Sequence, residues 1–172
     1  SLGNSKPYKN LRGLLHAFAL VAPRHPDLRL KIAGRGDSIR NLRALVDRLG
    51  VTDQVEFCGM VTETEVRRLF TGARALVSPS IVEGFGFPLV EAMTLGCPVI
   101  TSNIPVVREI VGEAAVCADP TRPEAIAAAI EQVLADGELR RRLRLLGQSR
   151  ASGFTWEACA ERTVDAYRTL LS

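Results

Sequence analysis

The feature of this sequence that most restricts its fold is the alternation of short strand-like runs with helical segments. Runs rich in Val, Ile, Leu and Ala predict strands at residues 28–33, 55–58, 75–78, 99–101 and 114–117. Apolar residues at helical spacing predict helices between them, near residues 10–22, 38–49, 62–72, 87–95 and 106–111. Such alternation with short loops implies right-handed crossovers. We therefore expect an α/β fold, a Rossmann-like doubly wound parallel sheet with its ligand site at the carboxyl ends of the strands.

The two ends of the chain depart from this alternation. The chain opens with Ser-Leu-Gly-Asn, which reads as the end of a strand whose beginning is absent. After Pro123 only helices are predicted, at residues 123–135, 137–151 and 156–171. Trp156, at the start of the last helix, is expected to pack in the core or at a hinge. We therefore expect residues 1–172 to form one domain with a truncated first strand and C-terminal helices.

Composition and charge exclude several classes of protein. Apolar residues make up 47% of the 172 residues and charged residues 24%, which excludes a disordered or fibrous chain. A net charge of +3 is too small to require nucleic acid as a partner. The longest uncharged stretch, residues 92–107, is interrupted by Gly and Pro and is too short to span a membrane. The basic run at residues 140–144 has two interpretations, a solvated helix face or a patch that meets a membrane surface.

No residues have the spacing of a metal site. The four cysteines show no C-x-x-C spacing and have no neighbouring histidine, which argues against zinc. The chain also contains no Asp-x-Asp pair that would hold a divalent cation beside phosphate groups. We therefore expect no metal.

The segment with most chemical information runs from Ser78 to Met93. A predicted strand ends at Ser78, and two glycines in the following loop let the backbone approach a ligand closely. The next helix starts near residue 87 and directs N–H groups at the same place, which favours an anion. Glu83 in the loop and Glu91 in the helix are spaced along one ligand, as carboxylates that accept hydrogen bonds from sugar hydroxyls would be. The alternative is that Glu91 complements the helix dipole and Glu83 is a solvated loop residue.

Another glycine pair imitates a dinucleotide-binding fingerprint. Gly34 and Gly36 follow a predicted strand, and Glu56 lies twenty residues further along the chain. However, Ile39 stands where the third glycine belongs, and Glu56 falls inside a predicted strand. We therefore do not expect this chain to bind a nicotinamide cofactor.

The order of the motifs adds a family resemblance. The run Glu-Gly-Phe-Gly-Phe-Pro-Leu-Val-Glu-Ala-Met at residues 83–93 resembles the E-x7-E signature of retaining glycosyltransferases of the GT-B fold, the large group one family. The resemblance continues in the family's order through residues 3–10, 33–36, 55–59, 96–99, 109–112, 119–120 and 154–156. It implies the C-terminal, donor-binding half of such an enzyme, with the N-terminal, acceptor-binding half absent from this chain.

The resemblance also implies roles for individual residues. Lys9 matches the lysine that neutralises the donor diphosphate, while Asn4 and Ser5 stand where the family usually has an arginine, a place that Arg35 or Lys6 would fill. Glu91 matches the glutamate that binds the ribose, and Glu83 the one that meets the transferred sugar, with Lys9 as its catalytic partner. The implied donor site comprises Lys9, Arg35, Gly59, Met60, Val61, Glu83, Gly84, Phe85, Gly86, Phe87, Pro88, Leu89 and Glu91, with backbone N–H groups of Phe85 to Leu89 around sugar and phosphate.

The implied reaction moves a hexose from a UDP or GDP sugar, with GDP-mannose favoured, to a glycan or lipid-linked acceptor in surface polysaccharide synthesis. The anomeric configuration is retained, and neither a metal nor another cofactor takes part. Such a protein would act in the cytoplasm or at the inner face of the membrane. Two alternatives remain open from the sequence, namely a non-catalytic module that binds nucleotide sugars and a GT-B relative such as a sugar-nucleotide epimerase.

Overall fold

The structure is a computed structural model that describes residues 1–36 and 39–171. All expected strands and helices are present, and their described ends lie within two residues of the expected ones. The expected start of the second helix at residue 38 lies outside the described residues. The strands are β1 (Leu30–Ala33), β2 (Val55–Gly59), β3 (Leu76–Ser78), β4 (Val99–Ser102) and β5 (Ala115–Ala118). The helices are α1 (Leu11–Val21), α2 (Ile39–Leu49), α3 (Glu63–Gly72), α4 (Phe87–Thr94), α5 (Pro105–Val111), α6 (Pro123–Ala135), α7 (Gly137–Ala151) and α8 (Trp156–Leu171). Short 3-10 turns lie at Pro7–Lys9, Ala22–Arg24 and Thr52–Gln54.

The strands are parallel, as expected, but they form two sheets instead of one. One sheet has the order β1-β2, and the other has the order β3-β4-β5. The start of the chain runs beside β1, where Leu2 forms a parallel bridge with Ala33. The expected α/β fold with parallel strands is thus present, and it is divided into two sheets because no strand among the described residues lies between β1 and β3.

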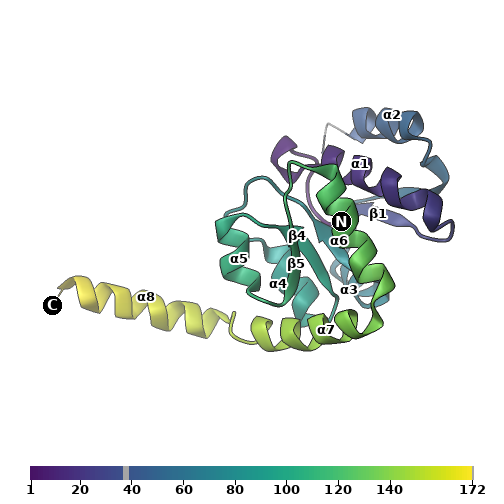
Figure 1. Ribbon diagram of the computed structural model, residues 1–172. Helices are drawn as coiled ribbons and strands as arrows, with labels where there is room; N and C mark the ends of the chain where they lie inside the picture. Colours follow the sequence, from purple (N-terminus) through teal and green to yellow (C-terminus); the bar gives the residue numbers. More distant parts are fainter. Residues whose placement is uncertain (37–38, 172) are drawn as a thin grey trace.

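Helices cover both faces of the strands and bury two apolar clusters (Figure 1). The first cluster joins α1, α2 and α6 to β1, with Phe18 and Ile126 among its buried side chains. The second joins α3, α4, α5 and α7, with Met93 and Val107 at its centre. Layers of helix on both faces of parallel strands account for the chain's high content of Ala, Leu and Val.

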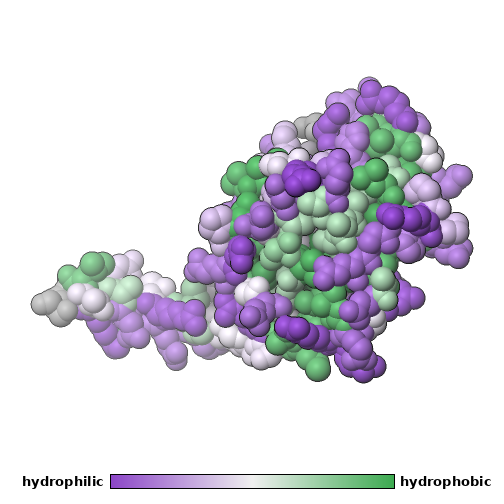
Figure 2. Space-filling view, in the orientation of Figure 1, coloured by the Kyte–Doolittle hydropathy of each residue, from purple (hydrophilic) through white to green (hydrophobic). Residues whose placement is uncertain are grey.

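The last helix, α8, extends away from the rest of the fold (Figure 1). Trp156 at its start is 78% exposed, so the expectation that this residue packs in the core or at a hinge is wrong. Tyr167 and Leu170 are 64% and 81% exposed on the same helix. Figure 2 shows apolar and polar residues side by side on this projecting segment. The amphipathic pattern therefore predicts the helix correctly, but its large apolar side chains are mostly exposed.

Gly34 marks the closest approach of two loops at the carboxyl edge of the sheets. Its φ is +126°, and a Cβ at this position would lie 1.7 Å from the carbonyl oxygen of Gly3. The Gly3 N–H in turn donates to the carbonyl of Ala33 at 3.0 Å. Because only glycine accommodates both the conformation and the contact, this residue fixes the start of the chain against the end of β1.

The close approach predicts a large effect for Gly34→Ala. We expect about 1–3 kcal/mol of backbone strain, plus a further ~1–3 kcal/mol for the clash with Gly3. Gly50→Ala is the matched control, since φ at Gly50 is +69° but nothing lies within 4 Å of an added Cβ. Urea unfolding of both variants measures the difference. Equal destabilisation of the two variants would contradict the assigned role of the Gly3–Gly34 contact.

Candidate functional site

The parallel strands bring five loops to one edge of the fold. The loop after β1 carries Arg35, the loop after β2 carries Met60, and the loop after β3 carries Glu83. The segment that leaves the start of the chain carries Lys9 to the same edge, and the turn after β5 carries Asp119. Residues far apart in the sequence therefore meet where the strands end.

Lys9 and Glu83 form an ion pair at this edge. The Lys9 Nζ donates to Glu83 Oε1 at 2.5 Å. The two side chains are only 16% and 10% exposed, so the pair is screened from most of the solvent. A lysine and a glutamate that were predicted to serve one ligand are thus in direct contact, although 74 residues separate them in the sequence.

Two backbone and side-chain contacts hold the loops of this pair together. The N–H of Ile81 donates to the carbonyl of Tyr8 at 2.7 Å, which ties the residue before Lys9 to the loop that contains Glu83. The hydroxyl of Ser80, a buried residue, donates to Glu83 Oε1 at 3.1 Å. Among the described residues no hydrogen bond reaches Oε2 of Glu83. That oxygen is available to accept from a ligand hydroxyl.

The loop after β3 is itself anchored to β4. The hydroxyl of Ser102 donates to the carbonyl of Ser80 at 2.5 Å, and the hydroxyl of Thr101 donates to the carbonyl of Ser78 at 2.9 Å. All four residues are buried. Because buried polar groups must be paired, these hydroxyls fix the path of the backbone that leads to Glu83.

Asn10 positions Lys9 from the other side. It adopts the left-handed conformation with φ of 54°, and its Oδ1 accepts from the N–H of Gly13 at 3.2 Å, which caps α1. Its Nδ2 donates to the carbonyl of Pro120 at 2.6 Å. The Thr121 hydroxyl and N–H donate to Asp119 and lower the pKa of that carboxyl, so the turn that carries Pro120 is held in an ionised, hydrogen-bonded form.

The glycine loop leads into α4 with N–H groups that are only partly free. Gly86 has φ of +92°, and a Cβ there would lie 2.9 Å from Leu89 Cδ1. Pro88 has no N–H group, and the N–H of Leu89 donates to the carbonyl of Gly86 at 2.9 Å. The expectation that N–H groups of all residues from Phe85 to Leu89 face a ligand is therefore wrong for these two. In the described chain, no group accepts from the N–H of Gly86 or Phe87.

The loop between Glu83 and α4 has room on its outer side. A Cβ at Gly84 would meet nothing within 4 Å. Phe85 turns inward, with its ring 5.0 Å from that of Phe87 and 5.6 Å from that of Phe154. This aromatic contact joins the loop to the segment between α7 and α8 and leaves the Gly84 side open.

The remaining predicted residues lie at the same edge without joining the ion pair. Arg35 is exposed, and its carbonyl accepts from the N–H of Ser5 at 3.3 Å. Gly59 ends β2 with φ of +69°, and the Met60 that follows is 68% exposed, beside a half-buried Val61. Glu91 is exposed on α4, and its carboxylate forms no hydrogen bond or ion pair with another described residue.

The predicted site does not coincide with the cavity between the two sheets. A cavity of about 450 Å³ lies between β1 and β3, and none of the predicted site residues lines it. In the residues that the structure covers, no three His, Cys, Asp or Glu side chains group as metal ligands would. Nor does any helix of that part have the length and apolarity to span a membrane.

Sequence reasoning missed the residues that assemble the ion pair. Tyr8 acts through its carbonyl, which no side-chain pattern reveals. Ser102 directly follows the strand predicted at residues 99–101, and Ser80 lies two residues after the strand predicted at residues 75–78; both serines are buried. A polar residue at the carboxyl end of an apolar strand would have been the signal for both.

Comparisons with known proteins show which family this chain resembles in sequence and in fold. The family described as "Glycosyl transferases group 1" matches residues 1–150. The O-antigen chain mannosyltransferase B of Escherichia coli is 37% identical over 98% of this chain and 45% of its own length. Sucrose-phosphate synthase from Thermosynechococcus elongatus superposes with a TM-score of 0.85 and 29% identity, over 99% of this chain and 45% of the other. The structure of Anabaena HepE in complex with UDP and glucose superposes with a TM-score of 0.84 and 22% identity. This superposition covers 98% of this chain and 48% of the HepE chain.

The chain thus spans less than half the length of these relatives. Its parallel strands flanked by helices correspond to one half of a GT-B glycosyltransferase structure. The match over residues 1–150 covers most of the chain and includes the Lys9–Glu83 edge. The chain therefore belongs to the group 1 glycosyltransferase family.

Proposed function

We propose that this chain binds a nucleoside diphosphate sugar, a UDP or GDP hexose, as the C-terminal donor half of a retaining glycosyltransferase. The observation that carries the proposal is the Lys9–Glu83 pair at the carboxyl edge, 2.5 Å apart and largely shielded from solvent. Beside it lie the N–H groups of Gly86 and Phe87, which have no acceptor in the described chain. A cation, an acceptor oxygen and backbone donors at one edge suit a ligand that has both phosphate and hydroxyl groups.

We assign a role in donor binding to each of the predicted residues. The Lys9 ammonium has three donors, of which one serves Glu83, so the others can meet a diphosphate and stabilise its departure. The free Oε2 of Glu83 would accept from the hexose. Glu91 on α4 would accept from the ribose, Arg35 would add a second cation, and residues 59–61 would lie along the nucleobase. The N–H groups of Gly86 and Phe87 would complete the phosphate site without a metal.

The similarity to a mannosyltransferase supports mannose, and hence GDP-mannose, as the favoured donor. The acceptor would be a glycan or a lipid-linked glycan of surface polysaccharide synthesis, held by an N-terminal domain. The exposed apolar side of α8, with Trp156 and Leu170, offers that domain a contact surface. The protein would act in the cytoplasm or peripherally at the inner face of the membrane.

Separate substitutions at Lys9, Glu83 and Glu91 test the assigned roles. Lys9→Met and Glu91→Gln should each weaken UDP or GDP binding about 10-fold or more, since hydrogen bonds to charged groups contribute about 1.5–3 kcal/mol. Glu83→Gln should leave the bare nucleotide nearly unaffected and weaken only the sugar nucleotide. Calorimetric titration with UDP, GDP, UDP-glucose and GDP-mannose measures all three effects.

Glu113→Gln is the control for these titrations, because Glu113 is an exposed carboxylate just before β5, at the opposite edge of the sheet. It should bind every ligand as the unchanged protein does. If Glu83→Gln and Glu91→Gln weaken the bare nucleotide equally, or if neither weakens any ligand, the division of roles is wrong.

Nucleotide binding should survive removal of divalent cations. Lys9 and the backbone donors of α4 supply the positive potential that Mg²⁺ or Mn²⁺ provides elsewhere. We expect unchanged Kd values in buffer with EDTA and in buffer with magnesium. A strict requirement for either cation would count against the proposed site.

The chain by itself should bind donor without transferring the sugar. Holding donor and acceptor together is worth roughly 7–11 kcal/mol, and the acceptor half lies outside this chain. We expect no labelled sugar to reach mannose oligosaccharides with the 172-residue protein. Turnover by this protein would show that the donor half suffices, and release of an epimerised donor would favour the epimerase alternative.

A further inference from the structure

The loop that carries Glu83 contacts the rest of the fold through the ring of Phe85. This ring lies 5.6 Å from the ring of Phe154, at an interplanar angle of 81°. Such an edge-to-face arrangement is one of those that aromatic pairs prefer. Both rings are half-buried and pack against the second apolar cluster. Phe154 therefore supports the loop from its inner side.

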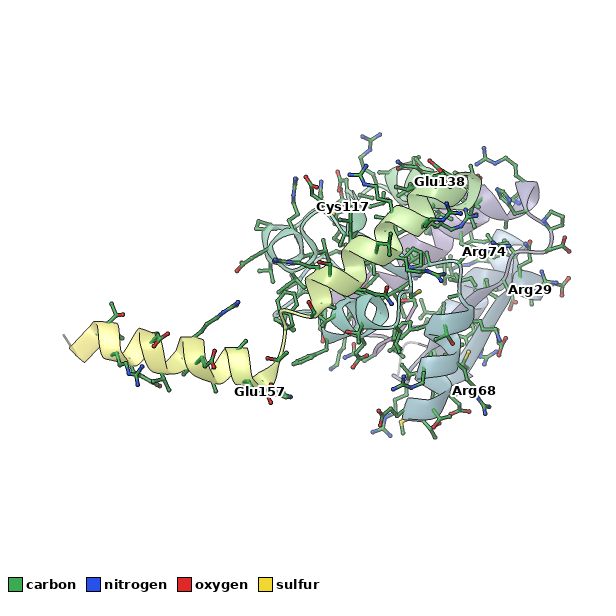
Figure 3. The ribbon with its side chains drawn as sticks, turned by 90° about the horizontal axis from the view of Figure 1, so that it is seen from below. Arg29, Arg68, Arg74, Cys117, Glu138 and Glu157 are labelled. Carbon is green, nitrogen blue, oxygen red and sulfur yellow. The ribbon has the colours of Figure 1, made fainter. Side chains whose placement is uncertain are left out.

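The position of Phe154 is set by α7. Figure 3 shows α7 lying along the fold from Glu138, near its start, to the bend that leads to Glu157 in α8. The N–H of Phe154 donates to the carbonyl of Ala151, the last residue of α7, at 3.0 Å. The ring is thus attached directly to the end of this helix.

α7 in turn packs closely on α4, the helix into which the loop leads. Gly147 of α7 lies against Met93 of α4, and a Cβ at this glycine would lie 3.2 Å from Met93 Cγ. Both residues are buried. Because close-packed interiors leave little room for groups to shift, α7 keeps a fixed place beside α4. Phe154 therefore keeps a fixed place beside the loop.

A second contact of the Phe154 ring comes from Arg150. The Arg150 guanidinium lies over this ring, 5.2 Å from its centre. Its Nε donates to the carbonyl of Ile110 at 2.9 Å, and its Nη2 donates to the carbonyl of Glu109 at 2.5 Å. These carbonyls belong to the last turn of α5, where a cation is favourable. Arg150 therefore joins the ring to α5 as well as to α7.

We propose that Phe154 is a positioning residue for donor binding and that Arg150 holds its ring in place. This inference rests on the donor-binding function proposed above. The ring supports Phe85 and so keeps Glu83 and the first N–H groups of α4 in position before a ligand arrives. Without this support the loop would have to become ordered on binding, and the conformational entropy lost would weaken the complex.

The ligand-free protein provides the first test, by ¹⁵N relaxation. Phe154→Leu keeps an apolar side chain but removes the ring, so the order parameters of the Phe85 and Gly86 amides should fall from about 0.85 to below about 0.6. Phe154→Tyr keeps the ring and should keep both values. Phe70→Leu is the matched control, because Phe70 is a buried residue of the same apolar cluster on α3. It should lower the Tm and leave both order parameters unchanged.

Calorimetric titration provides the second test. Whichever of UDP-glucose and GDP-mannose binds the unchanged protein should bind Phe154→Leu about threefold to tenfold more weakly. Phe154→Tyr and Phe70→Leu should bind it as the unchanged protein does.

A second variant covers failure of Phe154→Leu to fold. Arg150→Met, at an exposed position, removes the guanidinium from the ring and should lower the same two order parameters and weaken the same ligand at least about twofold. Unchanged order parameters in the substituted proteins would overturn the inference, as would an equal loss of order in Phe70→Leu. If neither ligand binds the unchanged protein, the proposed donor-binding function fails, whereas the order parameters still decide whether Phe154 holds the loop.

Discussion

The common direction of the strands is the constraint on which the candidate site depends. In a parallel sheet every strand ends at the same edge, so the chain must return through a helix before each new approach to the site. Lys9 follows the start of the chain, which runs parallel to β1 at Leu2, and Glu83 follows β3. The two side chains meet because both segments lead to the same edge. An antiparallel strand at either place would carry its loop to the opposite edge and separate the two charges.

The positions of Lys9 and Glu83 are fixed more by hydrogen bonds of neutral neighbouring groups than by the attraction between the two charges. Moving two charges out of water is unfavourable, and their mutual attraction offsets this only when the geometry is well supported. The support here comes from the Ile81–Tyr8 backbone hydrogen bond, the Ser80 hydroxyl and the Ser102 anchor beneath it. A preorganised pair of this kind keeps Lys9 in place for a phosphate and does not require a loop to become ordered on binding.

The parts of the fold that local signals determine could be predicted from the sequence. The sequence Thr62-Glu-Thr-Glu65 has the pattern of a capping box, which is present at the start of α3 and whose hydrogen bonds lower the pKa of Glu65. The proline after Phe87 likewise marks the start of α4. The division of the strands into two sheets and the exposure of Trp156 depend on which segments lie next to each other in space. The periodicity of apolar residues carries no information about such neighbours. Lys9 and Glu83 belong to sequence motifs and were therefore predicted as site residues. Tyr8 and Ser80 act through tertiary contacts that no motif shows, so they were not predicted.

The cavity and the candidate donor site are linked through one short segment. Ser1 borders the cavity, Gly3 lies against Gly34, and an added Cβ on Gly3 would lie 3.8 Å from Lys9 Cε. The position of the lysine stem thus depends on residues whose only ladder partner in the described chain is β1. The Gly3–Gly34 contact therefore helps to hold the Lys9 stem in place from a position outside the ion pair.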